Sequence, residues 1–283
     1  MEIYRKKKDL NRVIENFKSQ KLTSGLVPTM GALHQGHLSI VEQALMENDK
    51  VFVSIFVNPT QFNNKEDLEK YPRTFETDIE QLKAISDSNI IVYAPSVEDV
   101  YGEDVNSVDF DFDGLEEGME GQFRLGHFDG VGTVVKRLFE IVKPDNAYFG
   151  EKDFQQLMIV KKLVEKFKIP INIVGCPIHR ENDGLAMSSR NLRLSPEYRE
   201  AAPFIYKMLK KAKSQFATKS AKKVEDLVKK QFVNNKLLEL EYFTIAETST
   251  LKSFKRKSKN KSYRAFIAVY ADDVRLIDNI ALN

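Results

Sequence analysis

Short apolar runs alternate with amphipathic helical segments through the first 178 residues of this chain. The run at residues 50–57 (KVFVSIFV) is almost entirely β-branched or aromatic, which is typical of a strand buried on both faces. After a first helix at 6–20, strands and helices are expected in turn at 25–27, 38–45, 50–57, 75–85, 89–95, 129–142, 146–149, 154–167 and 171–175. This order predicts βαβ units, and therefore a Rossmann-like α/β fold with a parallel sheet and helices on both faces.

The pattern changes near residue 178, so we expect one domain at 1–178 and a second at 179–283. Residues 180–191 are polar and irregular. Beyond them the sequence predicts an α+β domain, with lysine-rich helices at 196–214 and 221–235 and strands at 240–246, 264–270 and 274–278. Apolar and acidic residues alternate at 107–112, which predicts a half-exposed strand at a sheet edge or an interface.

Composition points to an ordinary globular protein, with 42% hydrophobic and 30% charged residues. No apolar run approaches the ~20 residues of a membrane helix, and the first residues lack the apolar core of a signal peptide. The single cysteine, Cys176, permits no internal disulfide, so a cytoplasmic location is expected. No membrane partner is expected.

A basic segment at 252–264 has two interpretations. It contains Phe254 and Tyr263, which would stack on the bases of a bound nucleic acid. The alternative, a solvated hairpin loop between two strands, is favoured, and the net charge of +2 does not decide between them. No nucleic-acid partner is therefore expected.

The segment 28–37 (PTMGALHQGH) connects an expected strand to an expected helix. His34 and His37 flank Gly36 where the helix begins, and free N–H groups at a helix N-terminus favour a bound phosphate. Two histidines at this spacing also fit a metal pair or ordinary surface groups, although zinc would need a third ligand. The residues alone leave these alternatives open.

Other polar segments follow the expected strands. Residues 58–62 (NPTQF) come directly after the strand at 50–57, where open α/β sheets bind ligands. Residues 150–153 (GEKD) follow the strand at 146–149, and Asp153 is a natural N-cap for the next helix.

Seven segments, in this order along almost the whole chain, resemble the pantothenate synthetase family: PTMGALHQGH (28–37), FVNPTQF (56–62), YPRT (71–74), GHFDGV (126–131), YFGEKDFQQL (148–157), DGLAMSSRN (183–191) and RLIDN (275–279). The resemblance implies a ligase that joins pantoate to β-alanine. Pantoate would attack the α-phosphate of ATP to form pantoyl adenylate and pyrophosphate, and β-alanine would then displace AMP. It also implies Mg²⁺ bound mainly by phosphates, so we assign no metal-binding residue, and a homodimer.

The resemblance also implies roles for individual residues. His34, His37, Lys152 and Arg190 would be catalytic, with His37 the proton donor and Lys152 beside the α-phosphate. The C-terminal domain would act as a lid, carrying a loop at 187–190 that is similar to the KMSKS loop of class I aminoacyl-tRNA synthetases. The implied ATP-binding residues are Met30, His34, His37, Gly150, Lys152, Asp153, His179, Met187, Ser188, Ser189 and Arg190.

Two glutamines would bind the organic acids. Gln61 and Gln156 are neutral amides that would bind pantoate without lowering the nucleophilicity of its carboxylate. Gln61 would also bind β-alanine. Asp78 and Arg124 match positions near the phosphates, although surface solvation is an alternative for Asp78.

Two departures from the family pattern concern the loop at Leu125 and the adenine pocket at His179. A related nucleotidylyltransferase with another acceptor, and a non-enzymatic ATP- or RNA-binding module, remain as alternatives.

Overall fold

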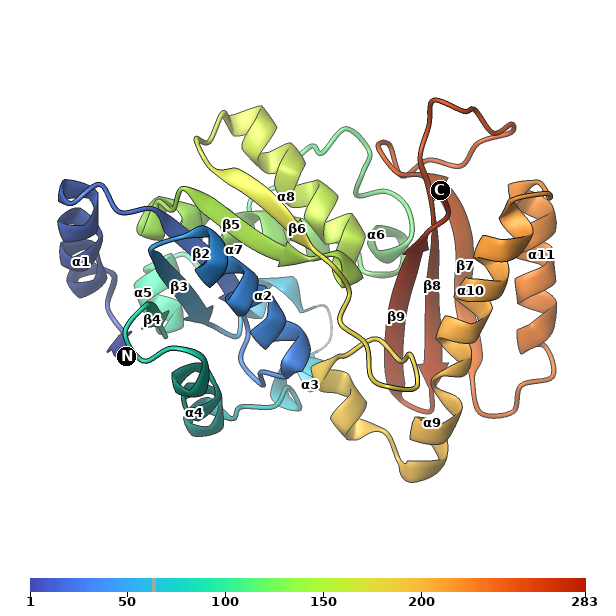
Figure 1. Ribbon diagram of the computed structural model, residues 1–283, viewed down its shortest axis with the longest axis horizontal. Helices are drawn as coiled ribbons and strands as arrows, with labels where there is room; N and C mark the ends of the chain where they lie inside the picture. Colours follow the sequence, from blue (N-terminus) through green and yellow to red (C-terminus); the bar gives the residue numbers. More distant parts are fainter. Residues whose placement is uncertain (63–64) are drawn as a thin grey trace.

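The computed structural model describes residues 1–62 and 65–283, which form two sheets with helices packed on them (Figure 1). The first sheet contains β1 (Glu2–Tyr4), β2 (Ser24–Thr29), β3 (Lys50–Ile55), β4 (Ile90–Tyr93), β5 (Asn146–Gly150) and β6 (Asn172–Cys176). The second contains β7 (Glu239–Glu247), β8 (Tyr263–Ala271) and β9 (Val274–Ala281).

All strand pairs of the first sheet are parallel, in the order β1-β4-β3-β2-β5-β6. The chain moves outward from β2 to β3 and β4, and then returns to place β5 on the other side of β2. The strand order therefore reverses between β2 and β5. In open α/β sheets, ligands bind outside the carboxyl ends of the strands at such a point.

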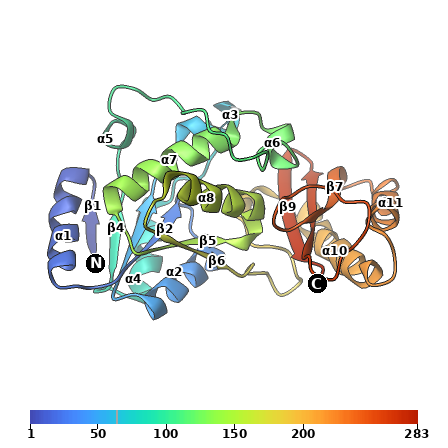
Figure 2. The same ribbon diagram turned by 90° about the horizontal axis from the view of Figure 1, so that it is seen from above.

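Helices cover both faces of this sheet, as the alternating sequence pattern predicted (Figure 2). The helices α1 (Lys7–Ser19), α7 (His127–Val142) and α8 (Phe154–Phe167) bury their apolar sides on one face. The helices α2 (Gln35–Glu47) and α4 (Phe75–Ile85) cover the other. Short helical elements occupy the connections: η1 (Pro59–Gln61), α3 (Lys65–Glu69), α5 (Val97–Tyr101), α6 (Glu120–Phe123), η2 (Glu151–Asp153) and η3 (Ser189–Arg193).

The second sheet is antiparallel, with β8 in the centre. The helices α10 (Phe204–Phe216) and α11 (Ala221–Phe232) pack on one of its faces, after the short helix α9 (Pro196–Ala201). Its other face meets the first part of the chain, where Phe266 of β8 lies 6.1 Å from Phe154 between ring centroids. The predicted α+β architecture is confirmed, and the division at residue 178 stays a prediction.

The strand predicted at 107–112 is wrong: these residues are described, and they run extended along α7 without joining a sheet. The N–H groups of Val108 and Phe110 donate to the Thr133 hydroxyl and the Asp129 carboxylate, at 2.8 and 2.9 Å. Phe112 is buried against the helices. The alternation therefore reflects packing against a helix rather than a strand ladder.

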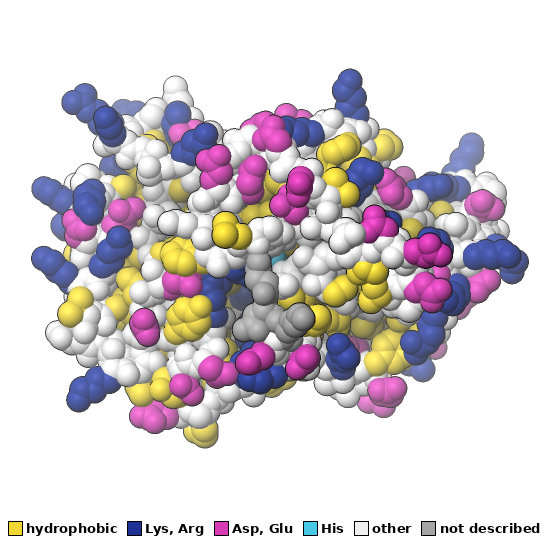
Figure 3. All heavy atoms as spheres, turned by 180° about the vertical axis from the view of Figure 1, so that it is seen from behind, with side chains coloured by type: hydrophobic (Ala, Val, Ile, Leu, Met, Phe, Trp, Pro, Cys, Tyr) yellow, Lys and Arg dark blue, Asp and Glu magenta, His cyan; other side chains and the backbone are white. Residues whose placement is uncertain are grey.

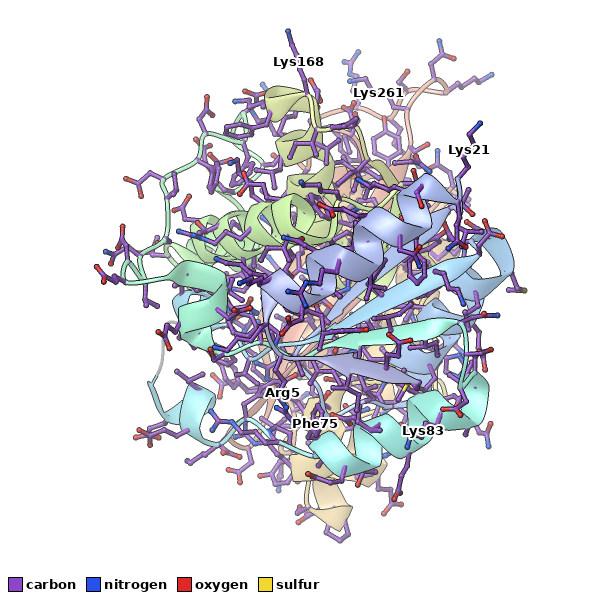
Figure 4. All side chains as sticks on the ribbon, turned by 90° about the vertical axis from the view of Figure 1, so that its left-hand side faces the viewer. Arg5, Lys21, Phe75, Lys83, Lys168 and Lys261 are labelled. Atoms are coloured by element: carbon purple, nitrogen blue, oxygen red, sulfur yellow. The ribbon has the colours of Figure 1, made fainter. Side chains whose placement is uncertain are left out.

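Two further differences have simple causes. The helix predicted at 196–214 is two helices, because Pro203 lies between α9 and α10. The three-residue strand β1 was not predicted, since a run so short carries almost no periodic signal. Just after β1, the Arg5 guanidinium lies 4.8 Å from the centroid of the Phe75 ring, and both are labelled in Figure 4.

Of the basic segment at 252–264, residues 252–262 lie in the loop between β7 and β8 and the last two begin β8, so the hairpin interpretation is confirmed. Tyr263 is 2% exposed and Phe254 packs on it at 4.2 Å between ring centroids, which removes the Tyr263 ring from base stacking. Lys261, which projects outward in Figure 4, pairs with Glu247 at 2.6 Å. Within the described part of the chain, no helix is both long and apolar enough to cross a membrane.

Candidate active site

A tight turn joins β2 to α2 and presents the two histidines. Gly31 and Ala32 both have positive φ, +80° and +49°, and such values are uncommon for a residue with a side chain. Thr29 stabilises the start of the turn: its hydroxyl donates to Ser54 O at 2.7 Å and accepts from Gly31 N at 3.2 Å. The backbone then enters α2 with His34 as its N-cap residue.

Asp78 of α4 supports this turn from beneath. One carboxylate oxygen accepts from Ala32 N at 3.0 Å, and the other accepts from Leu33 N at 2.8 Å and from the Thr74 hydroxyl at 3.0 Å. The side chain is 1% exposed, so the surface-solvation alternative for Asp78 is wrong. The helix looks exposed in sequence because most of its polar residues do face solvent, and only the three-dimensional contact distinguishes Asp78.

The rings of His34 and His37 stack with their centroids 4.0 Å apart. His34 Nδ1 accepts from Gly36 N at 3.1 Å, which leaves Nε2 to carry the proton of the neutral ring. Burial, with a smaller contribution from the charge of Lys152, lowers the pKa of His34 to about 4. Burial, then His34 and Lys152, lower the pKa of His37 to about 3. Near neutral pH the pair therefore offers uncharged hydrogen-bond donors.

These two histidines are expected to make the protein less stable as the pH falls. Because the unfolded chain binds protons on histidine near pH ~6.5 and the folded rings do so only at about 4 and about 3, acid favours the unfolded state. The stability is complete above pH ~6.5 and declines toward the folded pKa values. Urea unfolding at pH ~7.5 and ~5 tests this: His37→Gln should lose less stability between the two than the unsubstituted protein. Equal losses would contradict the expectation.

Lys152 lies in η2, directly after the end of β5. Its Nζ is 3.9 Å from the nearer carboxylate oxygen of Asp153, and its side chain is 19% exposed. Asp153 occupies the N-cap position of α8, but its side chain makes no capping hydrogen bond. The carboxylate therefore remains at the cavity. The N-cap interpretation gives the correct position of Asp153, but its side chain does not cap the helix.

The loop at 187–190 packs against the histidine turn. Ser189 is buried, and its hydroxyl donates to Ala32 O at 3.1 Å. Ser188 caps η3 by accepting from Arg190 N at 3.2 Å. Met187 N donates to His179 O at 3.1 Å, which joins this loop to the segment that follows β6. Residues about 150 positions apart thus form one wall of a cavity.

Gln61 lies across the cavity at the end of η1. Asn58 Nδ2 donates to Gln61 Oε1 at 3.1 Å, and Gln61 Nε2 donates to the Met30 sulfur at 3.2 Å. His127 Nδ1 lies 2.9 Å from Gln61 O and its Nε2 lies 3.1 Å from Arg124 Nη1, so the ring donates to the carbonyl and accepts from the guanidinium. Burial, then Arg124, lower the pKa of His127 to about 4.

Sequence reasoning assigned no role to Asn58 or His127. Both stand inside segments that carried the family resemblance, FVNPTQF and GHFDGV, and that was the available signal. Their polar atoms orient Gln61 and Arg124 rather than forming a motif of their own. Such support is visible only once the contacts are known.

These groups line one cavity of about 240 Å³ at the carboxyl ends of β2 and β5, where the strand order reverses. In the space-filling view from behind, a histidine side chain is visible at the bottom of a hollow in the surface (Figure 3). Every predicted site residue lines the cavity: Met30, His34, His37, Gln61, Gly150, Lys152, Asp153, Gln156, His179, Met187, Ser188, Ser189 and Arg190. Arg124 lines it too, and Asp78 lies behind its wall.

The donor set does not form a protein-only metal centre. Among residues 1–62 and 65–283, no group of three His, Cys, Asp or Glu side chains is arranged to hold a metal ion. Of the described residues lining the cavity, Asp153 alone carries a carboxylate. Histidines at a helix N-terminus, a lysine and an arginine instead favour an anion such as a polyphosphate.

A parallel sheet whose reversal point carries paired histidines, a lysine and a serine-arginine loop defines a nucleotide-binding α/β protein. The family model described as pantoate-beta-alanine ligase matches residues 2–281. The pantothenate synthetases of Christiangramia forsetii and Flavobacterium psychrophilum are each 57% identical to this chain, with 100% of both chains covered. The chain belongs to the pantoate-beta-alanine ligase family.

Solved structures agree with this assignment. The pantothenate synthetase of Thermus thermophilus has a TM-score of 0.91 and 37% identity, covering 100% of this chain and 99% of that one. The pantoate-beta-alanine ligase of Francisella tularensis, solved with "Beta-gamma ATP" and beta-alanine, has a TM-score of 0.80 and 36% identity, covering 100% and 98%. The expected family and fold are confirmed.

Proposed function

We propose that this ligase uses ATP to condense pantoate with β-alanine, through an enzyme-bound pantoyl adenylate, and releases AMP and pyrophosphate. The observation that supports it best is the single cavity, which combines polyphosphate-binding groups (His34, His37, Lys152 and Arg190) with two neutral glutamines, Gln61 and Gln156. The family membership and the ATP- and β-alanine-bound relative agree with it.

In the first half-reaction a carboxylate oxygen of pantoate attacks the α-phosphorus of ATP, and the bond to the β-phosphate oxygen breaks. Negative charge grows on the α-phosphate and on the departing pyrophosphate, so fixed cations and donors there lower the barrier. Lys152 would contact the α-phosphate, and Arg190 with Ser188 would contact the outer phosphates. His34 and His37 donate hydrogen bonds, and the approach of a polyanion raises their pKa toward proton donation by His37.

In the second half-reaction the amine of β-alanine attacks the acyl carbon, and the bond between that carbon and the AMP oxygen breaks. The amine loses a proton as the amide forms, and AMP leaves as a phosphate monoester. The protein contributes position rather than a covalent nucleophile. The amide of Gln61, oriented by Asn58 and lining the cavity, would contact both organic substrates.

We propose that Mg²⁺ enters with ATP and is held mainly by phosphate oxygens, since Asp153 is the cavity's one described carboxylate. Bound there, the ion would neutralise part of the phosphate charge. Asp153 would also accept a hydrogen bond from a ribose hydroxyl. The other proposed nucleotide-binding residues line the same cavity: Met30, Gly150, His179, Met187 and Ser189.

Replacing Gln61 with alanine is expected to weaken the binding of pantoate far more than the binding of ATP. Removing one neutral hydrogen-bonding partner of a bound substrate costs about 0.5–1.5 kcal/mol, which corresponds to a rise of up to about tenfold in the KM for pantoate. Steady-state kinetics with each substrate varied in turn measure it, with the exposed Gln35→Ala as control. Equal losses for ATP and pantoate would contradict the assignment.

We further propose that the enzyme is a cytoplasmic homodimer. Val105 and Val108 are 41% and 54% exposed, in or next to the segment 107–112 beside α7, and a second copy would cover these two side chains. Sedimentation equilibrium distinguishes a dimer from a monomer, and fractionation of cells locates the enzyme.

Product analysis tests the reaction as a whole. The purified protein with ATP, Mg²⁺, pantoate and β-alanine should form pantothenate, AMP and pyrophosphate in equal amounts. Formation of ADP and phosphate instead, or AMP without pantothenate, would overturn the proposal.

A further inference from the structure

The segment RLIDN (275–279) on β9 joins the two parts of the molecule and places no residue in the cavity that holds the nucleotide-site groups. Figure 2 shows β9 as the strand of the small sheet on the side of α6 and α8. Its side chains contact the first part of the chain and also Arg180, which lies in the segment that follows β6. Arg275 donates to both oxygens of Glu120 at 2.7 Å, and Asp278 accepts from Arg180 at 2.6 and 2.9 Å.

The third contact of this segment is with η2, the short helical turn that carries Lys152. Asn279 Nδ2 donates to the backbone carbonyl oxygens of Glu151 and Lys152, at 2.8 and 2.9 Å. These carbonyls belong to consecutive peptide groups of η2, on either side of the Lys152 Cα atom. Asn279 is 2% exposed, so water does not compete for the two hydrogen bonds.

Asn279 is itself held in one orientation. Arg264 of β8 donates through Nη1 to Asn279 Oδ1, and its Nη2 contacts Glu151 Oε2 at 3.0 Å. The Arg264 guanidinium lies 3.9 Å from the centroid of the Phe154 ring. The amide therefore cannot rotate without breaking a charge-assisted hydrogen bond, which is roughly twice as strong as a neutral one.

We propose that Asn279 is a positioning residue for Lys152, an inference that rests on the role proposed above for that lysine. Fixing the two peptide groups around a residue fixes the direction of its Cα–Cβ bond, and so where its side chain begins. The C-terminal sheet thereby sets where the Lys152 ammonium group meets the phosphates. A misplacement of about 1 Å at such a group costs about a hundredfold in rate.

If Asn279 had a purely structural role, its replacement would lower stability without changing the rate of adenylation. Asn48 provides the matched control for this alternative. Asn48 is also buried, at 8% exposed, and its Nδ2 also donates twice, to Ala44 O at 2.8 Å and to the Tyr148 hydroxyl at 2.7 Å. It lies at the C-terminal end of α2 and does not itself line the cavity, which it reaches only through Tyr148. Asn48→Ala should therefore lower stability without changing the rate of adenylation.

The test is a double-mutant cycle on pantoate-dependent adenylation, measured by single-turnover formation of pantoyl adenylate and accompanied by thermal unfolding. Asn279→Ala should slow the reaction on the order of a hundredfold, beyond any effect of Asn48→Ala at comparable stability. In a Lys152→Ala background the same change should cause no further loss, because its effect passes through the missing side chain. Asn279→Asp keeps the acceptor for Arg264 and removes the donor, so it should be slow as well.

Three outcomes would overturn the inference. Losses that multiply in the double variant would mean that Asn279 acts independently of Lys152. A rate for Asn279→Ala equal to that of Asn48→Ala would mean that it acts through stability alone. A normal rate for Lys152→Ala would refute the role of the lysine itself, whereas a slow Lys152→Ala with multiplying losses refutes only the positioning by Asn279.

Discussion

Replacing Lys152 with alanine is expected to reduce adenylation about 10²–10³-fold, the usual cost of removing one preorganised group that stabilises transition-state charge. The folded protein should be almost unaffected. The ammonium group has a carboxylate contact at 3.9 Å, to an Asp153 side chain that is 48% exposed, and partly exposed pairs of this kind contribute about 0–1 kcal/mol. The loss should therefore appear in the rate and not in the unfolding midpoint.

The next helix along the chain, α8, supplies a control for this substitution. Lys161 is exposed on α8, so Lys161→Ala removes the same charge away from the cavity. It should leave the rate within about twofold, because a charge beyond a Debye length is largely screened. An unfolded Lys152→Ala, or one as active as Lys161→Ala, would show that the lysine has a structural role or none.

Replacing Asp78 with alanine is expected to cause the largest combined loss, of stability and of activity. The change leaves Ala32 N and Leu33 N buried without an acceptor, and each such group costs about 1–3 kcal/mol. The positive φ at Gly31 and Ala32 would lose its support. His34 and His37 would then no longer be held in place, so adenylation should fall even well below the melting temperature.

Urea unfolding and adenylation rates together measure this effect, with Glu76→Ala as the control. Glu76 is exposed on the same helix, two residues earlier. It should change stability by no more than about 0.5 kcal/mol. If Asp78→Ala retained both its unfolding midpoint and its rate, the turn would not depend on the buried carboxylate.

The long periodic segments explain why most of the fold could be predicted. The helix at 154–167 and the strands at 50–57 and 171–175 match α8, β3 and β6 closely, because a sustained apolar period reflects burial directly. The strand predicted at 107–112 was wrong, because apolar and polar residues also alternate where an extended chain lies along a helix. Nothing local to these residues distinguishes a helix from a strand as the neighbour.

The residues of the site also fall into two groups, those that could be predicted from the sequence and those that could not. Groups that face the cavity, such as His37 and Lys152, stand in recognisable segments at strand ends and could be found from sequence. Groups that act from behind, such as Asp78 and Asn279, owe their importance to backbone atoms distant in sequence. Those partnerships depend on the tertiary structure, so they could not be predicted from the spacing of residues.

The central claim is that this cavity forms an acyl adenylate, and isotope exchange tests it most directly. With β-alanine absent, the protein should catalyse exchange of labelled pyrophosphate into ATP, and only when both pantoate and Mg²⁺ are present. Exchange without pantoate, or no exchange from a folded protein that binds ATP and still forms no AMP when β-alanine is added, would contradict the account.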